Sequence, residues 1–503
     1  MRSKLVLCVI DAMAPAMLER AIATGVAPIL ERLIQDGRYI PDCVAAFPSV
    51  TPVCAASIAT GVAQDAHLIP GMNWFHREEH RYVEYGSSFR SAQRFGITRQ
   101  LTDTVYNMNR AHLSPDTPTV FETLDDADVR TAGTTYLMYR GRYQHEPQRD
   151  TALTRVASTL MRHPVMGPRE LFYADIFASR RTGCRSGLGM PGVRDRHSGC
   201  VSAYMVEHDL FDFLLLSLPD NDWYSHKRGP EAQVHSIAQA DLQLGRVMNA
   251  AGGVEEFLRE HAVIVMADHS QAAVTGATSL QDELAELGVL GPTRSAEPNR
   301  DQDARIAVCP SQRAAMVYAL HEEERDAMRA STVALALALD GVDLVLWLER
   351  DAHDAPREGV IASSRHGELR FAPGGQVRDP RGLSWNLDGQ LGVIGGSLED
   401  GRLLSPDSPA ALARAWSALT CSTSGEVLLS AAPGHEFTDW GGQAHVGGGS
   451  HGSLHASDSL GALVLNGVAV AVEPGQWAIR DVAQLVRSHF GLAIDAAARA
   501  PSD

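Results

Sequence analysis

The sequence predicts an α/β protein with a mainly parallel central sheet, helices on both faces of that sheet and an inserted cap. Three apolar runs, at residues 4–10, 211–218 and 262–267, read as strands, because strands buried on both faces lose the polar alternation of half-exposed ones. Each run leads into a polar segment that carries Asp. The 503 residues, 45% of them hydrophobic, suit one large domain with an insertion, or about two to three average domains.

The charge of the chain limits its partners. A formal net charge of -17 opposes binding to nucleic acid polymers and anionic membranes, because both need clustered Lys and Arg. The longest apolar run near a predicted helix, residues 333–339, is far too short to cross a bilayer. We therefore expect a small-molecule substrate, and a negatively charged one needs a local positive site. No oligomeric state is indicated.

The cysteines indicate a reducing compartment. They are seven in number, scattered and without a CxxC pair, so we expect neither a disulfide framework nor a thiolate zinc site. The first apolar run ends at Asp11 without a small-residue cleavage site, which predicts a first strand rather than a signal peptide. Both observations predict a cytoplasmic protein.

The segment after the first strand predicts two covering helices, opened by Pro15 and Pro28, and then a hydroxyl at a helix start. Residues 47–61, FPSVTPVCAASIATG, read as a proline-broken loop that runs into an Ala-rich helix stopped by Gly61. Thr51 stands at the expected N-cap, where free backbone N–H groups favour an anion such as phosphate. It either caps the helix only or faces a ligand.

Residues 67–75, HLIPGMNWF, form the next predicted loop. Asn73 in this loop is either a turn former or a hydrogen-bond donor to a bound oxyanion. Residues 76–200 predict a helix near 120–124 and a strand at 130–137, and we assign no chemistry to them. The arginines of this stretch either lie on the solvated surface, which we expect, or reach a ligand; they are Arg140, Arg142, Arg180, Arg181 and Arg185.

Carboxylates and imidazoles follow the apolar runs. Asp11 follows the first, Asp222 and His226 stand four residues apart on a predicted loop after the second, and Asp268 and His269 follow the third directly. The carboxyl ends of parallel strands share one sheet edge, where open α/β sheets bind ligands. These side chains suit zinc or a similar divalent ion.

From about residue 280 the pattern changes to hairpins and helical pieces. Residues 360–372 read as a hairpin with a His-Gly turn, and an Ala-rich helix is predicted near 327–339. The expected division of the chain is a first core part at 1–280, an inserted cap at 281–435 and a C-terminal core part at 436–503.

The C-terminal part completes the candidate ligand set. Glycine-rich residues 445–459 carry His451 in a turn before a strand at 460–465. A terminal helix is expected from about 480 to 489.

Six short motifs stand in a defined order along the chain: Asp11 after the first strand, FPSVTP with Thr51, HLIPGMNWF, DWYSH before Gly-Pro, ADH at 267–269 and GSHG at 450–452. This order resembles the alkaline phosphatase superfamily and, within it, the type I phosphodiesterase and nucleotide pyrophosphatase family. The resemblance covers roughly residues 1–280 and 440–503. It departs from the family pattern at Ser225, where Gly usually precedes the histidine, and at residues 53–55, where Asn-His is frequent.

The resemblance implies an alkaline-phosphatase-like core with two divalent metal ions. We expect these ions to be Zn2+, with Mn2+ or another divalent ion as the alternative. The implied ligands are Asp222, His226 and His451 for one ion, and Asp11, Asp268, His269 and the hydroxyl of Thr51 for the other. Thr51 would be the nucleophile that forms a phosphothreonine, and Asn73 would donate to the phosphoryl oxygens. Ser49 is a rival nucleophile by its chemistry.

The implied function is hydrolysis of phosphate esters, with phosphodiesters or nucleotide pyrophosphates as expected substrates. No Lys or Arg occurs in residues 39–76 around Thr51, whereas a monoesterase needs cationic groups against the second phosphoryl charge. The alternatives on the same core are a phosphomonoesterase, a phosphonate hydrolase and a phosphosugar mutase. A noncatalytic metal-binding module is a further alternative, against which stands the presence of the complete candidate residue set.

Overall fold

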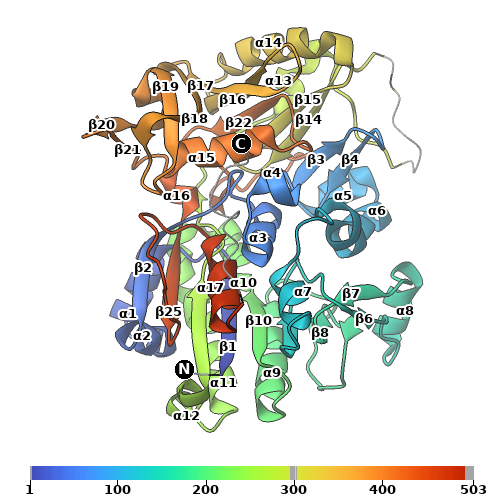
Figure 1. Cartoon of the computed structure of the whole chain (residues 1–503). Helices are drawn as coiled ribbons and strands as arrows, with labels where there is room; N and C mark the ends of the chain where they lie inside the picture. The colour runs from blue at the N-terminus through green and yellow to red at the C-terminus, as the bar shows by residue number, and fades with distance from the viewer. Residues whose placement is uncertain (1–2, 295–300, 302, 493–503) are drawn as a thin grey trace.

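The computed structural model describes residues 3–294, 301 and 303–492. Within these residues the chain builds two large sheets, one in the lower and one in the upper half of Figure 1. One hydrophobic cluster runs from Leu7 of the lower sheet through Leu412 and Trp416 of α15 (Ala411–Thr420) to Leu346 of the upper sheet. The two sheets therefore share a packed core.

The lower, central sheet has eight strands among the described residues, in the order β2-β25-β11-β1-β10-β5-β8-β9. Their bounds are β1 (Lys4–Ile10), β2 (Arg38–Val44), β5 (Thr131–Thr134), β8 (Glu170–Tyr173), β9 (Phe177–Ala178), β10 (Phe213–Leu218), β11 (His261–Met266) and β25 (Leu460–Asn466). β1 is parallel to β10 and β11, β10 to β5, and β5 to β8, whereas β2, β9 and β25 pair in antiparallel fashion. The prediction of a mainly parallel sheet is confirmed.

Helices cover both faces of this sheet, as predicted. On one face, Val6 and Cys8 pack with apolar residues of α1, α2, α9, α11 and α12. On the other, Leu5 and Leu7 pack with those of α3, α7 and α17. The bounds of these helices are α1 (Pro15–Ala23), α2 (Pro28–Gln35), α3 (Thr51–Thr60), α7 (Val120–Asp125), α9 (Arg194–Glu207), α11 (Gln233–Asn249), α12 (Val254–Glu260) and α17 (Asp481–His489).

The upper sheet lies within the segment interpreted as a cap. Its order in the described chain is β14-β15-β22-β16-β17-β18-β21-β20, with β19 paired to β18. The bounds are β14 (Ile306–Ser311), β15 (Ala314–Ala319), β16 (Val342–Arg350), β17 (Pro356–Ser363), β18 (Gly367–Arg378), β19 (Ser384–Gly389), β20 (Ser397–Glu399), β21 (Arg402–Leu404) and β22 (Val427–Ala431). The predicted hairpin is β17–β18, with Ser363 opposite Gly367, and the predicted Ala-rich helix is α14 (Arg325–Ala336). The division of the chain at 280 and 435 stays a prediction.

Two local expectations are wrong. The segment after β10 is a helix, α10 (Asp220–Arg228), and not a loop. Thr51 is the first residue of α3 and not its cap, because Val50 takes the N-cap position and no side chain makes a capping bond. The helix ends before Gly61 in the left-handed conformation, as predicted.

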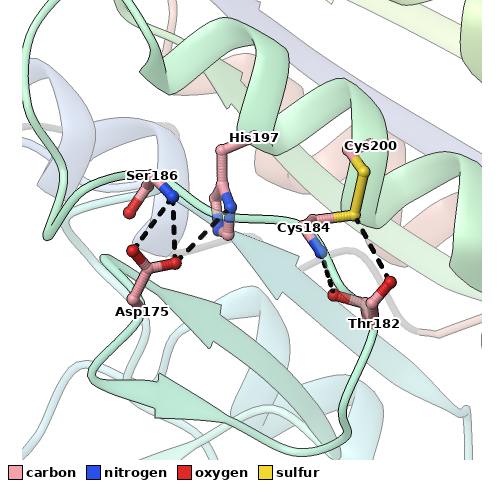
Figure 2. Close-up of a disulfide and its surroundings, with 6 residues drawn as sticks. All are labelled: Asp175, Thr182, Cys184, Ser186, His197 and Cys200. Carbon is pink, nitrogen blue, oxygen red and sulfur yellow. Dashed lines mark hydrogen bonds and ion pairs between the residues drawn. A yellow bond between two sulfur atoms is a disulfide. The ribbon is translucent and has the colours of Figure 1, made fainter. Parts of the chain in front are cut away.

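A disulfide joins Cys184 and Cys200 (Figure 2), contrary to the expectation drawn from the scattered cysteines. Cys184 lies in the loop before α9 and Cys200 within α9, with Cα atoms 5.9 Å apart. The loop is also held by Asp175, whose carboxylate accepts the backbone N–H of Ser186 at 3.0 Å. The pairing depends on this loop folding back on α9, which cysteine spacing does not reveal.

None of the helices in the described ranges is long and apolar enough to span a bilayer. The cytoplasmic location stays a prediction.

Candidate active site

One group of acidic and imidazole side chains forms where β1 and β11 end. Asp11 follows β1, and Asp268 and His269 follow β11, which is parallel to β1 and in register with it. His269 Nε2 lies 3.6 Å from Asp11 Oδ1 and 3.5 Å from Asp268 Oδ2. The backbone N–H groups of Ala12 and His269 donate to Asp268 Oδ1 at 3.1 and 3.0 Å, so Oδ2 is left facing the imidazole.

A second group forms around Asp222. Asp222 and His226 lie one turn apart on α10, because residues four apart share a helix face, and His226 Nε2 is 3.3 Å from Asp222 Oδ2. His451 follows β24 (Gly449–Ser450), which pairs with β12 (Ala272–Ala273) just beyond β11, and its Nε2 is 3.4 Å from Asp222 Oδ1. The ring of His269 stacks on that of His451 at 3.7 Å, so the two groups adjoin.

The tautomers of these histidines follow from their carbonyl partners. His226 Nδ1 contacts the carbonyl of Gly449, and His451 Nδ1 contacts that of Ser49, each at 2.7 Å. A carbonyl only accepts, so Nδ1 of each ring carries a proton, and Nε2 is the nitrogen that faces the Asp222 carboxylate and whose lone pair a metal ion would take. This arrangement is typical of histidines that bind a metal through Nε2.

The residues present fit divalent metal ions. Asp11 Oδ1 and His451 Nε2 are buried and find no hydrogen-bond partner within the described part of the chain. Ligand atoms of Asp11, Asp268 and His269, and likewise of Asp222, His269 and His451, lie within 4.8 Å of one another. Carboxylate oxygens and imidazole nitrogens are the ligands that zinc and similar ions take in proteins.

The site also concentrates negative charge. Burial, together with the carboxylates of Asp268 and Asp222, raises the pKa of Asp11 well above its usual range. Burial opposes ionisation of Asp222 as well, but the adjacent imidazoles of His226 and His451 outweigh it and lower the pKa of Asp222. A cation between such carboxylates would favour their ionised forms.

Thr51 presents its hydroxyl to this site. Its Oγ1 lies 3.3 Å from His269 Nε2, at the start of α3. Ser49, the rival nucleophile, is fully buried: its Oγ donates to the carbonyl of Ser453 at 3.0 Å and accepts from the N–H of Gly452 at 3.1 Å. Ser49 is therefore part of the framework that holds the His451 segment.

Asn73 is in a strand, not in a loop as predicted: it begins β3 (Asn73–His76), which pairs with β4 (Arg81–Glu84). Its side chain is buried, and Nδ2 donates to the carbonyl of Val83 at 2.8 Å. It is not among the residues that line the cavity described next. Its role toward an oxyanion stays a prediction.

A cavity of about 770 Å³ opens in front of Thr51, Asp11 and Asp222. Its lining includes the apolar and aromatic residues Leu101, Val105, Tyr136, Leu137, Met161, Tyr173, Ile176 and Leu188. The volume exceeds what a phosphate group needs, since sites for drug-sized ligands span roughly 300–1,000 Å³.

Two cations that the sequence did not single out line the same cavity. Arg194, at the start of α9, is oriented by Asp220, whose Oδ1 accepts from Nε at 3.0 Å. Lys227 follows His226 on α10, and its Nζ lies 4.1 Å from the ring centroid of Trp223. Adjacency to His226 was an available signal for Lys227, whereas Arg194 stands in a stretch without a motif.

The five arginines expected at the surface do not line this cavity. Arg140 is an exception to the surface expectation, because its side chain is mostly buried. It pairs with Glu122 at 3.0 Å and donates to the carbonyls of Leu113 and Ser114, which makes it a structural cation.

Comparisons with known proteins give a family and a fold for this chain. A model of the type I phosphodiesterase / nucleotide pyrophosphatase family matches residues 5–358. No curated protein matches the sequence. Phosphonoacetate hydrolase from Sinorhizobium meliloti 1021, solved with phosphonoformate, is 16% identical with a TM-score of 0.55, over 97% of this chain and 96% of that chain.

Murine ectonucleotide pyrophosphatase / phosphodiesterase 5 is 11% identical with a TM-score of 0.56, over 97% of this chain and 95% of that chain. Its inactive variant in complex with AMP is also 11% identical, with a TM-score of 0.58, over 98% and 96% of the two chains. At these identities the solved structures show a common fold.

Proposed function

The chain belongs to the type I phosphodiesterase / nucleotide pyrophosphatase family of phosphoester hydrolases, and we propose that it cleaves phosphodiesters or nucleotide pyrophosphates through a phosphothreonine at Thr51. The observation that carries the proposal is the Thr51 hydroxyl, 3.3 Å from His269 Nε2 between two carboxylate–imidazole groups and open to a large cavity.

The candidate ligands divide into one set around His269 and another around Asp222. Two divalent ions held there would polarise the phosphoryl group, favour ionisation of the Thr51 hydroxyl and stabilise the leaving oxygen. The ligand atoms concerned are Asp11 Oδ1, Asp268 Oδ2 and His269 Nε2 on one side, and Asp222, His226 Nε2 and His451 Nε2 on the other.

Thr51 Oγ1 attacks phosphorus as the bond to the leaving oxygen breaks, and the product is a phosphothreonine ester. Water then attacks the same phosphorus, breaks the Thr51 Oγ1–phosphorus bond and restores the hydroxyl. In the first turn of α3, Pro52 has no N–H and the N–H of Cys54 donates to the carbonyl of Val50 at 3.0 Å. The backbone N–H groups of Thr51 and Val53 are therefore the donors that this turn would offer to the non-bridging oxygens.

The cavity favours a substrate with organic groups on both sides of the phosphorus. Its apolar wall accepts a ring or chain, and Arg194 and Lys227 offer positive charge for an anionic leaving group such as a nucleotide phosphate. The segment around Thr51, residues 39–76, has no Lys or Arg, but Arg194 and Lys227 bring positive charge to the cavity from other segments. AMP in the murine relative is a ligand of the chemistry expected for a product of such a reaction.

The same two cations favour one second candidate, a phosphonate hydrolase. A carboxylate on the substrate would pair with Arg194 or Lys227, and the phosphonate would take the place of the ester at Thr51. In that reaction the phosphorus–carbon bond breaks in the first step, and the departing carbon keeps the electron pair and takes a proton from water.

The test compares bis(4-nitrophenyl) phosphate with 4-nitrophenyl phosphate, which release the same phenol, in zinc-loaded protein. We expect a higher kcat/KM for the diester. A clear excess for the monoester would refute the diester proposal, and phosphate release from phosphonoacetate alone would favour the second candidate. Incorporation of 18O from labelled water into the product separates a hydrolase from a mutase, which retains the phosphoryl group.

A further inference from the structure

The turn of the β14–β15 hairpin extends from the upper sheet into the candidate active site. Gln312 and Arg313 form this turn, with Gln312 at a φ of 63°. The backbone N–H of Arg313 donates to the carbonyl of His451 at 2.9 Å, and the N–H of Phe437 donates to the carbonyl of Gln312 at 2.9 Å. The turn is therefore bonded to the segment that carries a candidate metal ligand.

Arg313 fixes the position of this turn. Its side chain is fully buried, forms an ion pair with Asp458 and donates through Nε to the carbonyl of His435 at 3.0 Å. Gly452 packs so closely under the turn that an added Cβ would lie 2.9 Å from the carbonyl oxygen of Ser311. A side chain on such a support has a defined position, as substrate-binding groups require.

The side-chain amide of Gln312 faces the Asp222 side of the site. Its Nε2 lies 3.4 Å from His226 Nε2, the nitrogen whose lone pair a metal ion would take, and its Oε1 is buried with no hydrogen-bond partner among the residues that the structure describes. A metal ion on His226 Nε2 would occupy that lone pair, so the amide N–H would then need another acceptor in the same space. Gln312 lines the cavity together with Thr51 and Asp222.

We propose that Gln312 is a substrate-binding residue whose amide N–H donates to the leaving-group oxygen; this rests on the proposed function. Thr51 lies on the side of His269, and in-line displacement places the leaving oxygen opposite the attacking Oγ1, on the side of Asp222 and His226. As the Thr51 Oγ1–phosphorus bond forms, the electron pair of the breaking phosphorus–oxygen bond goes to the leaving oxygen. That oxygen accepts the hydrogen bond from Gln312 Nε2 and takes its proton from water.

The test uses a series of methyl aryl phosphates whose leaving phenols differ in pKa. In Gln312→Ala, kcat/KM falls about 10²-fold for the poorest leaving group, the usual effect of removing one oxyanion donor, and progressively less for better ones. Gln312→Glu, which replaces the donor by a carboxylate, falls at least as far. The matched control is Gln376→Ala, an exposed glutamine of β18 in the same sheet.

Zinc titration of metal-stripped protein by calorimetry provides a readout independent of turnover. We expect wild type, Gln312→Ala and Gln376→Ala to bind zinc with the same stoichiometry and similar Kd. A large loss of zinc affinity in Gln312→Ala would overturn the proposal in favour of Oε1 as a metal ligand. An equal loss of kcat/KM across the whole phenol series would overturn it in favour of a purely structural role. Absence of turnover in wild type would instead refute the proposed function, and the leaving-group role with it.

Discussion

Thr51→Ala separates the chemistry of the site from its architecture. The hydroxyl makes one contact of note, 3.3 Å to His269 Nε2, and does not cap α3, because Val50 is the N-cap. Alanine has the best helix propensity at such a position. The substitution therefore removes the proposed nucleophile and leaves the carboxylates and imidazoles in place.

The expected magnitudes differ widely for activity and stability. One lost hydrogen bond at a partly buried position changes the free energy of unfolding by ~1 kcal/mol. Loss of a covalent nucleophile lowers kcat by ~10⁴-fold or more, since single removals of this kind reach ~10⁶-fold. Zinc binding persists because the Asp and His ligands remain.

The assay measures kcat on a diaryl phosphate, zinc content and urea unfolding for the same preparations, with acid quenching to detect phosphate on Thr51 in wild type. Ser49→Ala is the matched control. It leaves the N–H of Gly452 without its acceptor, which lowers unfolding free energy by ~1–3 kcal/mol, while turnover continues. Substantial turnover in Thr51→Ala, or its loss only in Ser49→Ala, would refute the assignment of the nucleophile.

Three further predictions concern stability and access. Burial raises the pKa of Glu84 to about 7 from an ordinary 4.5, so the folded chain keeps a proton that the unfolded chain releases, and this group's contribution to the unfolding free energy falls by ~3 kcal/mol as pH rises from below 4.5 to above 7. Burial also raises the pKa of Asp195 to about 7, so the decrease in unfolding free energy between pH 5 and pH 8, measured by urea unfolding, should be smaller in Glu84→Gln than in wild type; an equal decrease in both would count against this. Asp458→Ala leaves the fully buried Arg313 without its ion-pair partner and should lower the free energy of unfolding by ~3–5 kcal/mol. Superimposable urea unfolding curves for the variant and wild type would contradict this. Reduction of the Cys184–Cys200 disulfide, whose cysteines are 16 residues apart, should lower the free energy of unfolding by ~3 kcal/mol. Because the loop that carries Cys184 contributes to the cavity wall, reduction should also raise KM more than it lowers kcat. Unchanged kinetics with dithiothreitol would count against this.

The central sheet was predictable because its strands are buried on both faces. Continuous apolar runs mark β1, β10 and β11, and parallel pairing then places Asp11 and Asp268 at one edge. The same reasoning failed for α10. Its residues are polar enough to read as a loop, although the four-residue spacing of Asp222 and His226 is that of neighbours on a helix.

Other features depend on contacts distant in sequence, which no local pattern reports. The Cys184–Cys200 disulfide needs the loop to fold back on α9, and Arg194 reaches the cavity because Asp220 of another element orients it. Both lie in the stretch at 76–200 that showed no motif. A cation from that stretch alters the charge expected around the phosphoryl group, and hence the choice of substrate.

The upper sheet changes how the site is closed. A site built only from strand ends would be open opposite the central sheet, so water could reach a leaving oxygen freely. The buried Arg313–Asp458 pair and the bond from Arg313 to the His451 carbonyl bring the β14–β15 turn against the metal-ligand segment. Gln312 of this turn lies beside His226. It therefore faces the Asp222 group of side chains, on the side where the proposed reaction places the leaving oxygen. If Gln312 binds the leaving group as proposed, the segment between β11 and β25 supplies one side of the candidate reaction centre, in addition to a surface that covers it.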